Sequence, residues 1–383
     1  MNYLFICGSV EPTYCGIGKY TGKVARMLQH NNFEVQYLTD YVQNDINNNI
    51  NKNSDSFSGR IHYFNSKKAG LVSIYKLVKS TNPDVVNIEH QTFGKNFSDC
   101  LFGLTCKLAY SKVKVINTIH EFNHFSTLGK IRLSVNGLFA DRLVFSDTNQ
   151  LKKFKAFTRN IFANKSISTI VGSGVDMCLT NFDTPEFSDK TLNIVFHGFI
   201  QEAKGLHFIL EALAQFTKPF TLTIIGEFKV LLQSNTQDDV LMYQKKCLDI
   251  IERNPVLQSS VLVTGDVDPT SKAFQDFLLN KELAIFPFLD SVTLRRTSFV
   301  NTLINSKCNF VSTFDADVSE PVLESVKGIE ASADSILHFL NTYSNLTPPQ
   351  KQELNIKQLA LRNYLLPKNT KEQIVQDMSK FAR

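Results

Sequence analysis

Short apolar runs of strand length alternate with segments of helical periodicity through the first half of the chain. The apolar runs predict strands at residues 3–7, 34–38, 85–88, 113–119, 143–145 and 167–171. Residues 17–28 follow the first run and repeat apolar side chains every three or four positions, which is typical of an amphipathic helix. Strands that alternate with helices predict a mostly parallel sheet with helices on both of its faces.

The same alternation restarts after a polar stretch at residues 179–190. Later strands are expected at residues 192–196, 220–225, 261–264, 283–288 and 310–312, and a helix at 206–216. We therefore expect two doubly wound α/β domains, at residues 1–180 and 191–370, joined by a linker at 181–190. An amphipathic segment at 371–383 predicts a last helix that packs back on the first domain. Doubly wound folds bind ligands at the carboxyl ends of their strands, so we expect the two domains to face each other across a ligand-binding cleft.

Composition narrows the class of protein. The 383 residues are 43% hydrophobic and 20% charged, which excludes a disordered or fibrous chain. No apolar run approaches the roughly 18 residues of a membrane span. The seven cysteines include no C-x-x-C pair, which argues against a disulfide framework or a structural zinc site and for a reducing compartment. Because the N-terminus lacks a basic n-region and a cleavage site, the expected location is cytoplasmic.

Basic residues gather in the first half of the chain. Residues 1–180 contain 21 Lys and Arg against 12 Asp and Glu, whereas the remainder contains 20 against 24. The densest basic stretch is residues 151–165, where Phe154, Phe157 and Ile161 recur at helical spacing and predict a basic amphipathic helix. Three interpretations stay open: a solvated surface helix, peripheral contact with anionic headgroups of the inner membrane face or a phosphorylated acceptor, and nucleic acid. No binding-module signature accompanies the charge, so nucleic acid is not expected as a partner.

Two loops between a strand and a helix are candidates for anion binding. Gly16 and Gly18 follow the first strand, where glycines let backbone N–H groups approach an anion at a helix N-terminus. The next glycine is Gly22, one position too late for G-x-G-x-x-G, and no G-K-[ST] closes a P-loop, so a plain tight turn is the alternative. Lys204 lies in the corresponding loop of the second half. It would neutralise a diphosphate there, or else it is a surface lysine beside a turn.

A third candidate loop follows the predicted strand at residues 283–288. It contains the adjacent residues Arg295 and Arg296, and Thr297 or Ser298 is expected to N-cap the next helix. Free backbone N–H groups at that helix N-terminus, together with a guanidinium, would hold a phosphate. A solvated surface loop is the alternative interpretation.

One histidine ends a predicted strand of the first domain. His120 and Glu121 follow the strand at 113–119, and His124 comes four positions after His120. A His-x-x-x-His pair binds zinc when it lies on a helix, but this segment starts at a strand end and no third ligand is evident. Three interpretations of His120 remain: a metal ligand, a structural histidine and an active-site histidine.

Taken together, these segments resemble the GT-B fold glycosyltransferases of family 4, the group 1 glycosyltransferases. The matching segments are Gly16-Ile17-Gly18-Lys19-Tyr20-Thr21, Thr118-Ile119-His120-Glu121, Gly172-Ser173-Gly174-Val175-Asp176, residues 198–205 followed by Leu210-Glu211-Ala212, and residues 290–298. In the same order, the family's motifs that they resemble are the G-G-I-G-x-Y-T loop, the strand-end histidine motif and the N-G-V-D signature. The fourth segment resembles the family's G-x-x-x-x-x-K-G…L-E-A segment, and the fifth resembles the D-G-V-S-x-R-R-x-S loop of a polysaccharide-associated branch. The matches keep the family's order and span most of the chain.

The resemblance implies a retaining hexosyltransferase-type enzyme for surface polysaccharide or glycolipid synthesis. Its donor would be a UDP- or GDP-linked sugar bound by the second domain, and its acceptor a glycan or lipid-linked molecule bound by the first. His120 and Lys204 would be the catalytic residues. The donor diphosphate would contact Gly16, Gly18, Lys204, Arg295, Arg296, Thr297 and Ser298. The donor sugar, ribose or base would contact Glu121, Val267, Asp290, Asn301 and Thr302. In the mechanism usual for the family, the departing phosphate takes the acceptor proton, so neither a metal nor a cofactor is expected.

Two departures from the family pattern leave a second function open. Many members have an arginine before the lysine, where this chain has Phe199 and Gln201. The family's paired-glutamate motif, which grips the ribose, is absent: Asp290 stands near its first position, and Asn301 and Thr302 near its second. The alternative is a catalytically impaired GT-B subunit that binds a nucleotide or a partner enzyme. A Rossmann-like dehydrogenase is disfavoured, because the chain lacks G-x-G-x-x-G.

Overall fold

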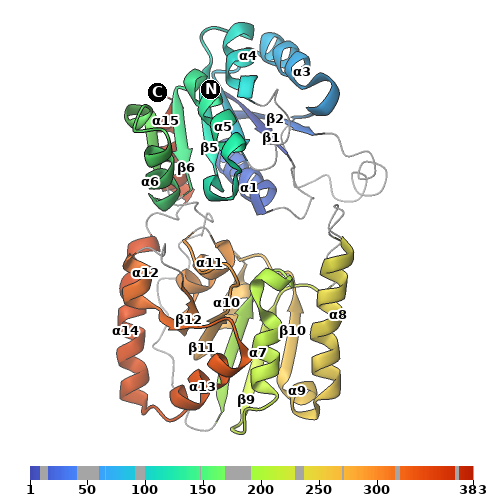
Figure 1. Cartoon of the computed structure of the whole chain (residues 1–383), viewed down its shortest axis with the longest axis vertical. Helices are drawn as coiled ribbons and strands as arrows, with labels where there is room; N and C mark the ends of the chain where they lie inside the picture. The colour runs from blue at the N-terminus through green and yellow to red at the C-terminus, as the bar shows by residue number, and fades with distance from the viewer. Residues whose placement is uncertain are drawn as a thin grey trace. The chain divides into compact units, whose positions relative to one another are not determined.

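The structure is a computed structural model in which two compact units are distinguished (Figure 1). The described residues are 1–8, 16–40, 60–64, 66–90, 100–146, 148–168, 191–228, 237–269, 271–294, 296–314, 320–366 and 371–382. Unit 1 is Met1–Gly174 with Lys371–Arg383, and unit 2 is Val175–Thr370. The predicted linker at 181–190 lies outside the described residues, as does the segment compared with the N-G-V-D signature.

Unit 1 is built on a seven-stranded sheet in the order β3-β2-β1-β4-β5-β6-β7, in which neighbouring strands are parallel. The strands are β1 (Asn2–Cys7), β2 (Glu34–Asp40), β3 (Arg60–Phe64), β4 (Val85–His90), β5 (Lys114–Ile119), β6 (Arg142–Phe145) and β7 (Ser166–Ser168). The strand order reverses direction between β1 and β4. The carboxyl ends of these two strands are therefore the switch point of the sheet, where doubly wound folds bind ligands.

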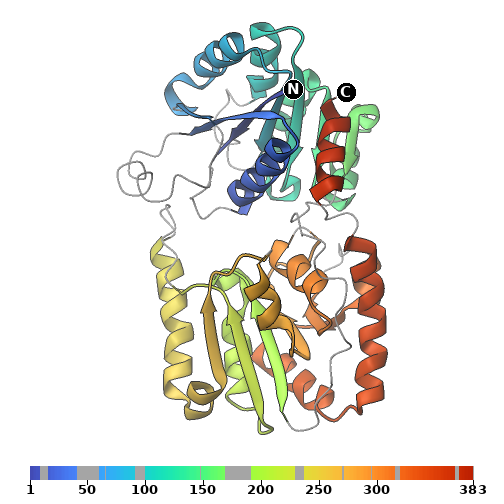
Figure 2. The ribbon, with the colours of Figure 1, turned by 180° about the vertical axis from the view of Figure 1, so that it is seen from behind.

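Two helix layers cover the sheet of unit 1. One layer consists of α3 (Ser66–Thr81), α4 (Phe102–Ala109), α5 (Thr127–Phe139) and α6 (Thr148–Phe157), with the 3-10 turns η4 (Phe122–His124) and η5 (Ala163–Lys165). The other consists of α1 (Gly16–His30) and α15 (Lys371–Ala382), which lie side by side in Figure 2. The Tyr3 hydroxyl donates to the Met378 carbonyl at 3.4 Å. The last helix of the chain thus belongs to the core of unit 1.

Unit 2 has a six-stranded parallel sheet in the order β10-β9-β8-β11-β12-β13. The strands are β8 (Leu192–His197), β9 (Phe220–Ile225), β10 (Val261–Gly265), β11 (Leu283–Phe286), β12 (Asn309–Thr313) and β13 (Lys327–Ile329). The helices are η6 (Glu202–Lys204), α7 (Leu206–Leu213), α8 (Gln237–Arg253), α9 (Pro255–Ser260), α10 (Lys272–Leu278), α11 (Thr297–Asn305), α12 (Glu320–Ser325), α13 (Ala333–Tyr343) and α14 (Pro348–Leu365). Here the order reverses between β8 and β11, which places the switch point at their carboxyl ends.

The two doubly wound parallel sheets confirm the predicted α/β class. Alternating strands and helices are found where the apolar pattern predicts them, because parallel strands buried on both faces are apolar almost throughout. The pattern does not predict β3 or β13. Both lie at sheet edges, and β13 is short and largely exposed, so neither produces a sustained apolar run.

The helix predicted at residues 151–165 is wrong in its second half. α6 ends at Phe157, and the chain then turns through Arg159 and Asn160, whose φ angles of 49° and 62° are left-handed. Phe154 is fully buried, whereas Ile161 is 75% exposed, so these two apolar side chains do not share one helix face. Among the described helices, none combines the length and the apolar composition that crossing a bilayer requires.

Candidate functional site

Two loops meet at the switch point of unit 2. The first runs from the end of β8 through Gly198 and Lys204 to α7, and the second runs from the end of β11 through Phe288 to α11. The Leu289 N–H donates to the Ala203 carbonyl at 3.1 Å and ties the two loops together. Their position at the carboxyl ends of β8 and β11 makes these loops the candidate site of this unit.

Close approach of the main chain requires glycine at two positions of this edge. Gly205 has a φ of 70°, and a Cβ atom there would collide with the carbonyl oxygen of Pro287. A Cβ atom on Gly226, which follows β9, would collide with the carbonyl oxygen of Gly198. Main chain therefore packs directly on main chain, and this packing fixes the loop of Lys204 against the loop that follows β11.

Two cationic side chains share one aromatic ring. Lys204 Nζ lies 4.8 Å from the centroid of the Phe288 ring, and Arg296 Cζ lies 4.6 Å from the same centroid. Phe288 is fully buried, so the ring is a fixed platform whose π-face attracts both cations. Arg296 also forms an ion pair with Asp290. Two cations against one carboxylate leave an excess of positive charge, which an anion would compensate.

The surroundings of Lys204 oppose its positive charge. Burial, followed by the nearby Arg296 guanidinium, lowers the pKa of Lys204 to about 7, and Asp290 acts in the opposite direction. A bound anion would favour the ammonium form and raise this pKa again. The charge on Lys204 at neutral pH therefore depends on whether an anion is present.

The N-terminus of α11 lies beside these cations. The helix begins at Thr297, and its N-cap residue is Arg296, whose side chain makes no capping hydrogen bond. The prediction that Thr297 or Ser298 caps the helix is wrong, because both residues lie within its first turn. The N–H groups of a first turn have no partner within their own helix, and they carry the positive end of its dipole.

Ser298 contributes a buried hydroxyl to the same place. Its buried Oγ atom has no hydrogen-bond partner among the described residues. A Cβ atom added to Gly198 would lie 3.5 Å from this oxygen and 4.0 Å from Lys204 Cδ, so the three residues surround one point. We refer to Gly198, Lys204, Arg296, Thr297 and Ser298 as the anion site.

Three residues predicted to contact the donor sugar, ribose or base differ in how far they are buried. Thr302 is fully buried, where its Oγ1 lies 2.9 Å from His197 Nδ1 and donates to the Ser298 carbonyl at 2.8 Å. Asn301 is buried in the same helix, whereas Val267 is partly exposed in the segment that follows β10. Thr302 therefore holds β8 against α11, and the nucleotide contacts of all three residues stay predictions. Arg295 lies outside the described residues.

A buried polar network lies at the corresponding edge of unit 1. His120 follows β5, and its Nε2 lies 2.7 Å from Oε2 of Glu89 on the neighbouring strand β4. The Asn87 amide donates to the other Glu89 oxygen at 2.9 Å, and the Thr118 hydroxyl donates to Asn87 at 2.8 Å. The Tyr20 ring meets the His120 ring edge-on, with centroids 5.3 Å apart. The carboxylate thus fixes the orientation of the His120 ring.

Burial at this edge also affects Tyr20. Desolvation, followed by the charge of Glu89, raises the pKa of Tyr20 above its usual range, so its hydroxyl stays protonated. Sequence reasoning did not find Glu89. The signal for it is a Glu-His pair, residues 89 and 90, at the end of a strand that is otherwise buried and apolar.

Other predicted residues of unit 1 lie near the same edge. α1 begins at Gly16, one residue before the predicted start of this helix, so Gly16 and Gly18 both belong to its first turn. Glu121 is exposed and precedes η4, where its side chain makes no capping hydrogen bond. The contacts of these residues with a donor stay predictions.

The metal interpretation of His120 gains no support in the part of the chain that the structure describes. No group of three or more His, Cys, Asp or Glu side chains there is placed to hold a metal ion. His120 Nε2 already contacts Glu89. A carboxylate partner of this kind is also typical of a histidine that is held in place as a structural or an active-site residue.

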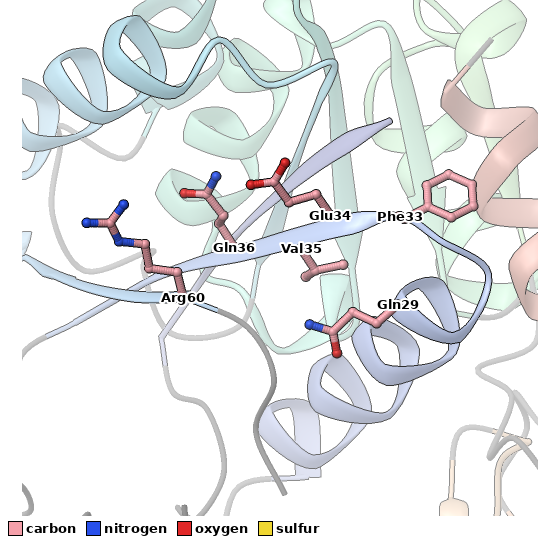
Figure 3. Close-up of a pocket in the computed structure, with 6 residues that line it drawn as sticks. All are labelled: Gln29, Phe33, Glu34, Val35, Gln36 and Arg60. Atoms are coloured by element: carbon pink, nitrogen blue, oxygen red, sulfur yellow. The ribbon is translucent and has the colours of Figure 1, made fainter. Parts of the chain in front are cut away.

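One hollow of unit 1 lies away from these residues. It has a volume of about 360 Å³ and lies where β2 and β3 begin, as Figure 3 shows; its lining residues are Gln29, Phe33, Glu34, Val35, Gln36 and Arg60. Glu34 and Gln36 extend to one side of β2 and Val35 to the other. The hollow is at the amino ends of the strands, and its polar groups do not converge on one point, so it is not the candidate site.

Comparisons with known proteins identify the fold. No model of a protein family matches this sequence, and no curated protein matches it. The apo form of the lipopolysaccharide outer core galactosyltransferase WaaB matches with a TM-score of 0.60 at 12% identity, over 100% of this chain and 99% of that one. HepE of Anabaena, in complex with UDP and glucose, matches with a TM-score of 0.66 at 14% identity, over 99% of this chain and 98% of that one.

A third match limits what the fold alone implies. A Listeria monocytogenes protein assigned as a UDP-N-acetylglucosamine 2-epimerase has a TM-score of 0.55 at 11% identity, over 93% of this chain and 90% of that one. The two Rossmann-like domains of this chain therefore form a GT-B fold, as the sequence predicts. A named transferase and an assigned epimerase share this fold, so the chemistry has to be argued from the residues.

Proposed function

We propose that this protein is a glycosyltransferase that moves a sugar from a UDP- or GDP-linked donor to a glycan or lipid-linked acceptor. The observation that carries the proposal is the anion site of unit 2. There, Lys204 and Arg296 lie on the Phe288 ring beside the uncapped N-terminus of α11. The comparisons support it, since HepE of Anabaena has been solved with UDP and with UDP-glucose.

In this proposal the anion site holds the donor diphosphate. Negative charge grows on the diphosphate as its bond to the sugar breaks, and preorganised donors stabilise such a charge more than they stabilise the starting state. Lys204 and Arg296 supply positive charge, the N–H groups of Thr297 and Ser298 supply hydrogen bonds, and the Ser298 hydroxyl gains a partner. No metal ion is needed, because these groups neutralise the leaving diphosphate.

The finer parts of the proposal rest on the resemblance to family 4. The transfer retains the configuration of the sugar, and the departing phosphate oxygen takes the proton of the acceptor hydroxyl. Unit 1 binds the acceptor, and His120, held by Glu89, contacts the transferred sugar. The product is a surface polysaccharide or a glycolipid.

A second candidate function is a GT-B subunit that binds a nucleotide or a partner enzyme without turnover. The ion pair between Arg296 and Asp290 favours it, because the carboxylate partly neutralises the guanidinium before any anion arrives. The burial of Thr302, where the family has a ribose-binding glutamate, points in the same direction.

Calorimetry and a turnover assay separate the two functions. The intact chain is titrated with UDP and with GDP, and sugar release is then measured from UDP- and GDP-linked sugars. We expect binding and turnover, with both reduced in Lys204→Ala; the loss of one stabilising contact lowers the rate by about 10²–10³-fold. Lys245→Ala, which changes an exposed lysine of α8, is the matched control.

Each outcome assigns a function. Nucleotide binding without turnover of any donor favours the non-catalytic subunit. Turnover that is indifferent to Lys204→Ala overturns the assignment of the anion site, and the absence of both binding and turnover overturns the proposed function.

A further inference from the structure

α11 is buried along almost its whole length. Its residues from Ser298 to Asn305 are all buried. Phe299, near its start, packs edge-on against the core rings of Phe286 and Phe310, with centroids 5.5 and 5.7 Å away. Apolar packing of this kind is non-directional, so it holds the helix in the core without fixing its position along its own axis. Hydrogen bonds, which depend on distance and angle, have to fix that position.

His197 bonds the first turn of α11. This residue ends β8 and immediately precedes Gly198 of the anion site. Its Nδ1 lies 3.1 Å from the Ser298 carbonyl oxygen and 2.9 Å from Thr302 Oγ1. A carbonyl oxygen can only accept, and the Thr302 hydroxyl already donates to this one at 2.8 Å, so Nδ1 carries a proton and is the donor. The imidazole thus ties the end of β8 to the first turn of α11.

The His197 ring is itself held in place. It meets the ring of Phe274 on α10 edge-on, with centroids 4.9 Å apart, and both side chains are buried. Three elements, β8, α10 and α11, therefore fix the position of the imidazole. A donor held in this way loses little conformational freedom when it bonds, which makes it suitable for setting the position of a helix.

Arg362 bonds the last turn of α11. It lies on the buried face of α14, which contacts α11, and its Nε donates to the Ile304 carbonyl at 3.0 Å (Figure 1). The carbonyls of a last turn have no partner within their own helix, and they carry the negative end of its dipole. A buried guanidinium satisfies one of these carbonyls and has the charge that the dipole favours. Each end of α11 is therefore bonded to a side chain from another element.

Another polar residue of the same face of α14 bonds the sheet. Gln358 accepts a hydrogen bond from the Phe310 N–H at 2.9 Å and donates one to the Phe310 carbonyl at 3.1 Å. Its amide thus bonds β12 as a neighbouring strand would. Gln358 and Arg362 are both buried and four residues apart on one helix, but the first holds β12 and the second holds α11.

We propose that His197 and Arg362 are positioning residues of the anion site, which act on it through α11. The inference rests on the proposed function, because it concerns the diphosphate that the first turn of α11 would bind. A helix of nine residues moves as one body, so release of either end shifts the N–H groups of Thr297 and Ser298. Such a shift matters because N–H···O bonds weaken beyond about 3.2 Å and a binding site tolerates a displacement of only about 0.5 Å.

Calorimetric titration of the full chain with UDP, GDP and inorganic pyrophosphate tests the proposal. His197→Phe keeps a ring against Phe274 but removes the donor, and Arg362→Met keeps an unbranched side chain but removes the donor. We expect each variant to raise the Kd by about tenfold or more, with the number of binding sites per chain unchanged. His197→Asn and Arg362→Lys, which restore a donor, should recover most of the affinity.

A purely structural role gives a different result. Loss of folded protein lowers the number of binding sites, whereas the Kd of the molecules that remain folded does not change. Gln358→Met is the matched control, because it removes two hydrogen bonds of a buried side chain on α14. It should lower stability in urea without raising the Kd. Lys357→Met removes an exposed cation of the same helix and should change neither quantity.

Every outcome bears on the proposal. If UDP binds to His197→Phe and Arg362→Met with the wild-type Kd, this inference alone is overturned. The same conclusion follows if Gln358→Met raises the Kd as much as they do. A rise in Kd in only one of the two variants overturns the role of the other residue. A wild type that binds pyrophosphate but neither nucleotide overturns the proposed function, and the variants then decide the inference on pyrophosphate. A wild type that binds none of the three probes overturns both.

Discussion

His120 Nε2 lies 2.7 Å from a carboxylate oxygen of Glu89, and both side chains are buried. Glu89 lies on β4 and His120 directly follows β5, so the pair joins two neighbouring strands at the edge of the sheet where ligands are expected. A buried carboxylate is tolerated only where its partners compensate for lost hydration, and here His120 and Asn87 do so. The pair thus links the stability of unit 1 to the orientation of His120.

The first prediction concerns the removal of this carboxylate. Glu89→Leu leaves His120 and Asn87 without their partner, so the free energy of unfolding of unit 1 should fall by about 3–5 kcal/mol. Glu89→Gln keeps a hydrogen-bonding side chain of the same shape, so it should lower the free energy of unfolding less. Urea denaturation measures both values, and Glu34→Gln, at an exposed position, is the control. Equal stability of Glu89→Leu and the wild type would contradict the pairing.

The second prediction concerns proton uptake by Lys204. Its pKa is lowered to about 7, so most of the side chain is neutral at pH 8 in the free protein. A diphosphate favours the ammonium form, so binding of UDP near pH 8 should be accompanied by proton uptake. The terminal phosphate of the nucleotide, with a second pKa of about 6, is already ionised at pH 8 and contributes little to the proton uptake. Calorimetry in two buffers with different ionisation enthalpies measures the uptake, which Lys204→Met should abolish.

The same lowered pKa predicts a pH dependence of stability without nucleotide. Between about 7 and the ordinary lysine value of 10.5, the unfolded chain binds more protons at Lys204 than the folded chain does. The contribution of Lys204 to the free energy of unfolding should therefore rise with pH through this window. Denaturation of the wild type and of Lys204→Met at pH values across the window isolates this contribution. A difference between them that does not vary with pH would contradict it.

The fourth prediction compares two glycines with left-handed backbone. Gly205 and Gly265 have φ angles of 70° and 80°, so alanine strains the backbone at both, by about 1 kcal/mol. At Gly265 a Cβ atom meets nothing within 4 Å, whereas at Gly205 it collides with the carbonyl oxygen of Pro287. Gly205→Ala should therefore lose more stability than Gly265→Ala, and it should also weaken nucleotide binding because it displaces the loop of Lys204. Denaturation and nucleotide titration of both variants test this.

The fifth prediction separates a ligand-binding hydroxyl from a structural one. Ser298 Oγ is buried without a described partner, so Ser298→Ala should leave stability unchanged or raise it slightly while lowering the affinity for UDP. Thr302→Val removes the hydrogen bonds of the Thr302 hydroxyl with His197 and with the Ser298 carbonyl and should cost about 1–2 kcal/mol of stability. The opposite pattern would show that Ser298 has a packing role only.

Much of the fold follows from the sequence because the relevant signals are local. Apolar runs and helical periodicity predict most strands of both sheets, and parallel strands bring their carboxyl ends to one edge. The resemblance to family 4 assigns the loops that contain Lys204 and Arg296 to one diphosphate, and in the structure both loops follow the carboxyl ends of neighbouring strands, β8 and β11. The edge strands β3 and β13 are not predicted, since neither produces a sustained apolar run, and β13 is only three residues long and largely exposed.

Tertiary structure alone decided what surrounds these residues. Glu89 and His120 are 31 residues apart and become partners only because β4 pairs with β5. Phe288 becomes the common platform of Lys204 and Arg296 because two loops pack main chain against main chain. Local periodicity shows that a helix has an apolar face but not whether anything covers it. For that reason the sequence predicted one amphipathic helix over residues 151–165, whereas α6 ends at Phe157 and Ile161 is 75% exposed.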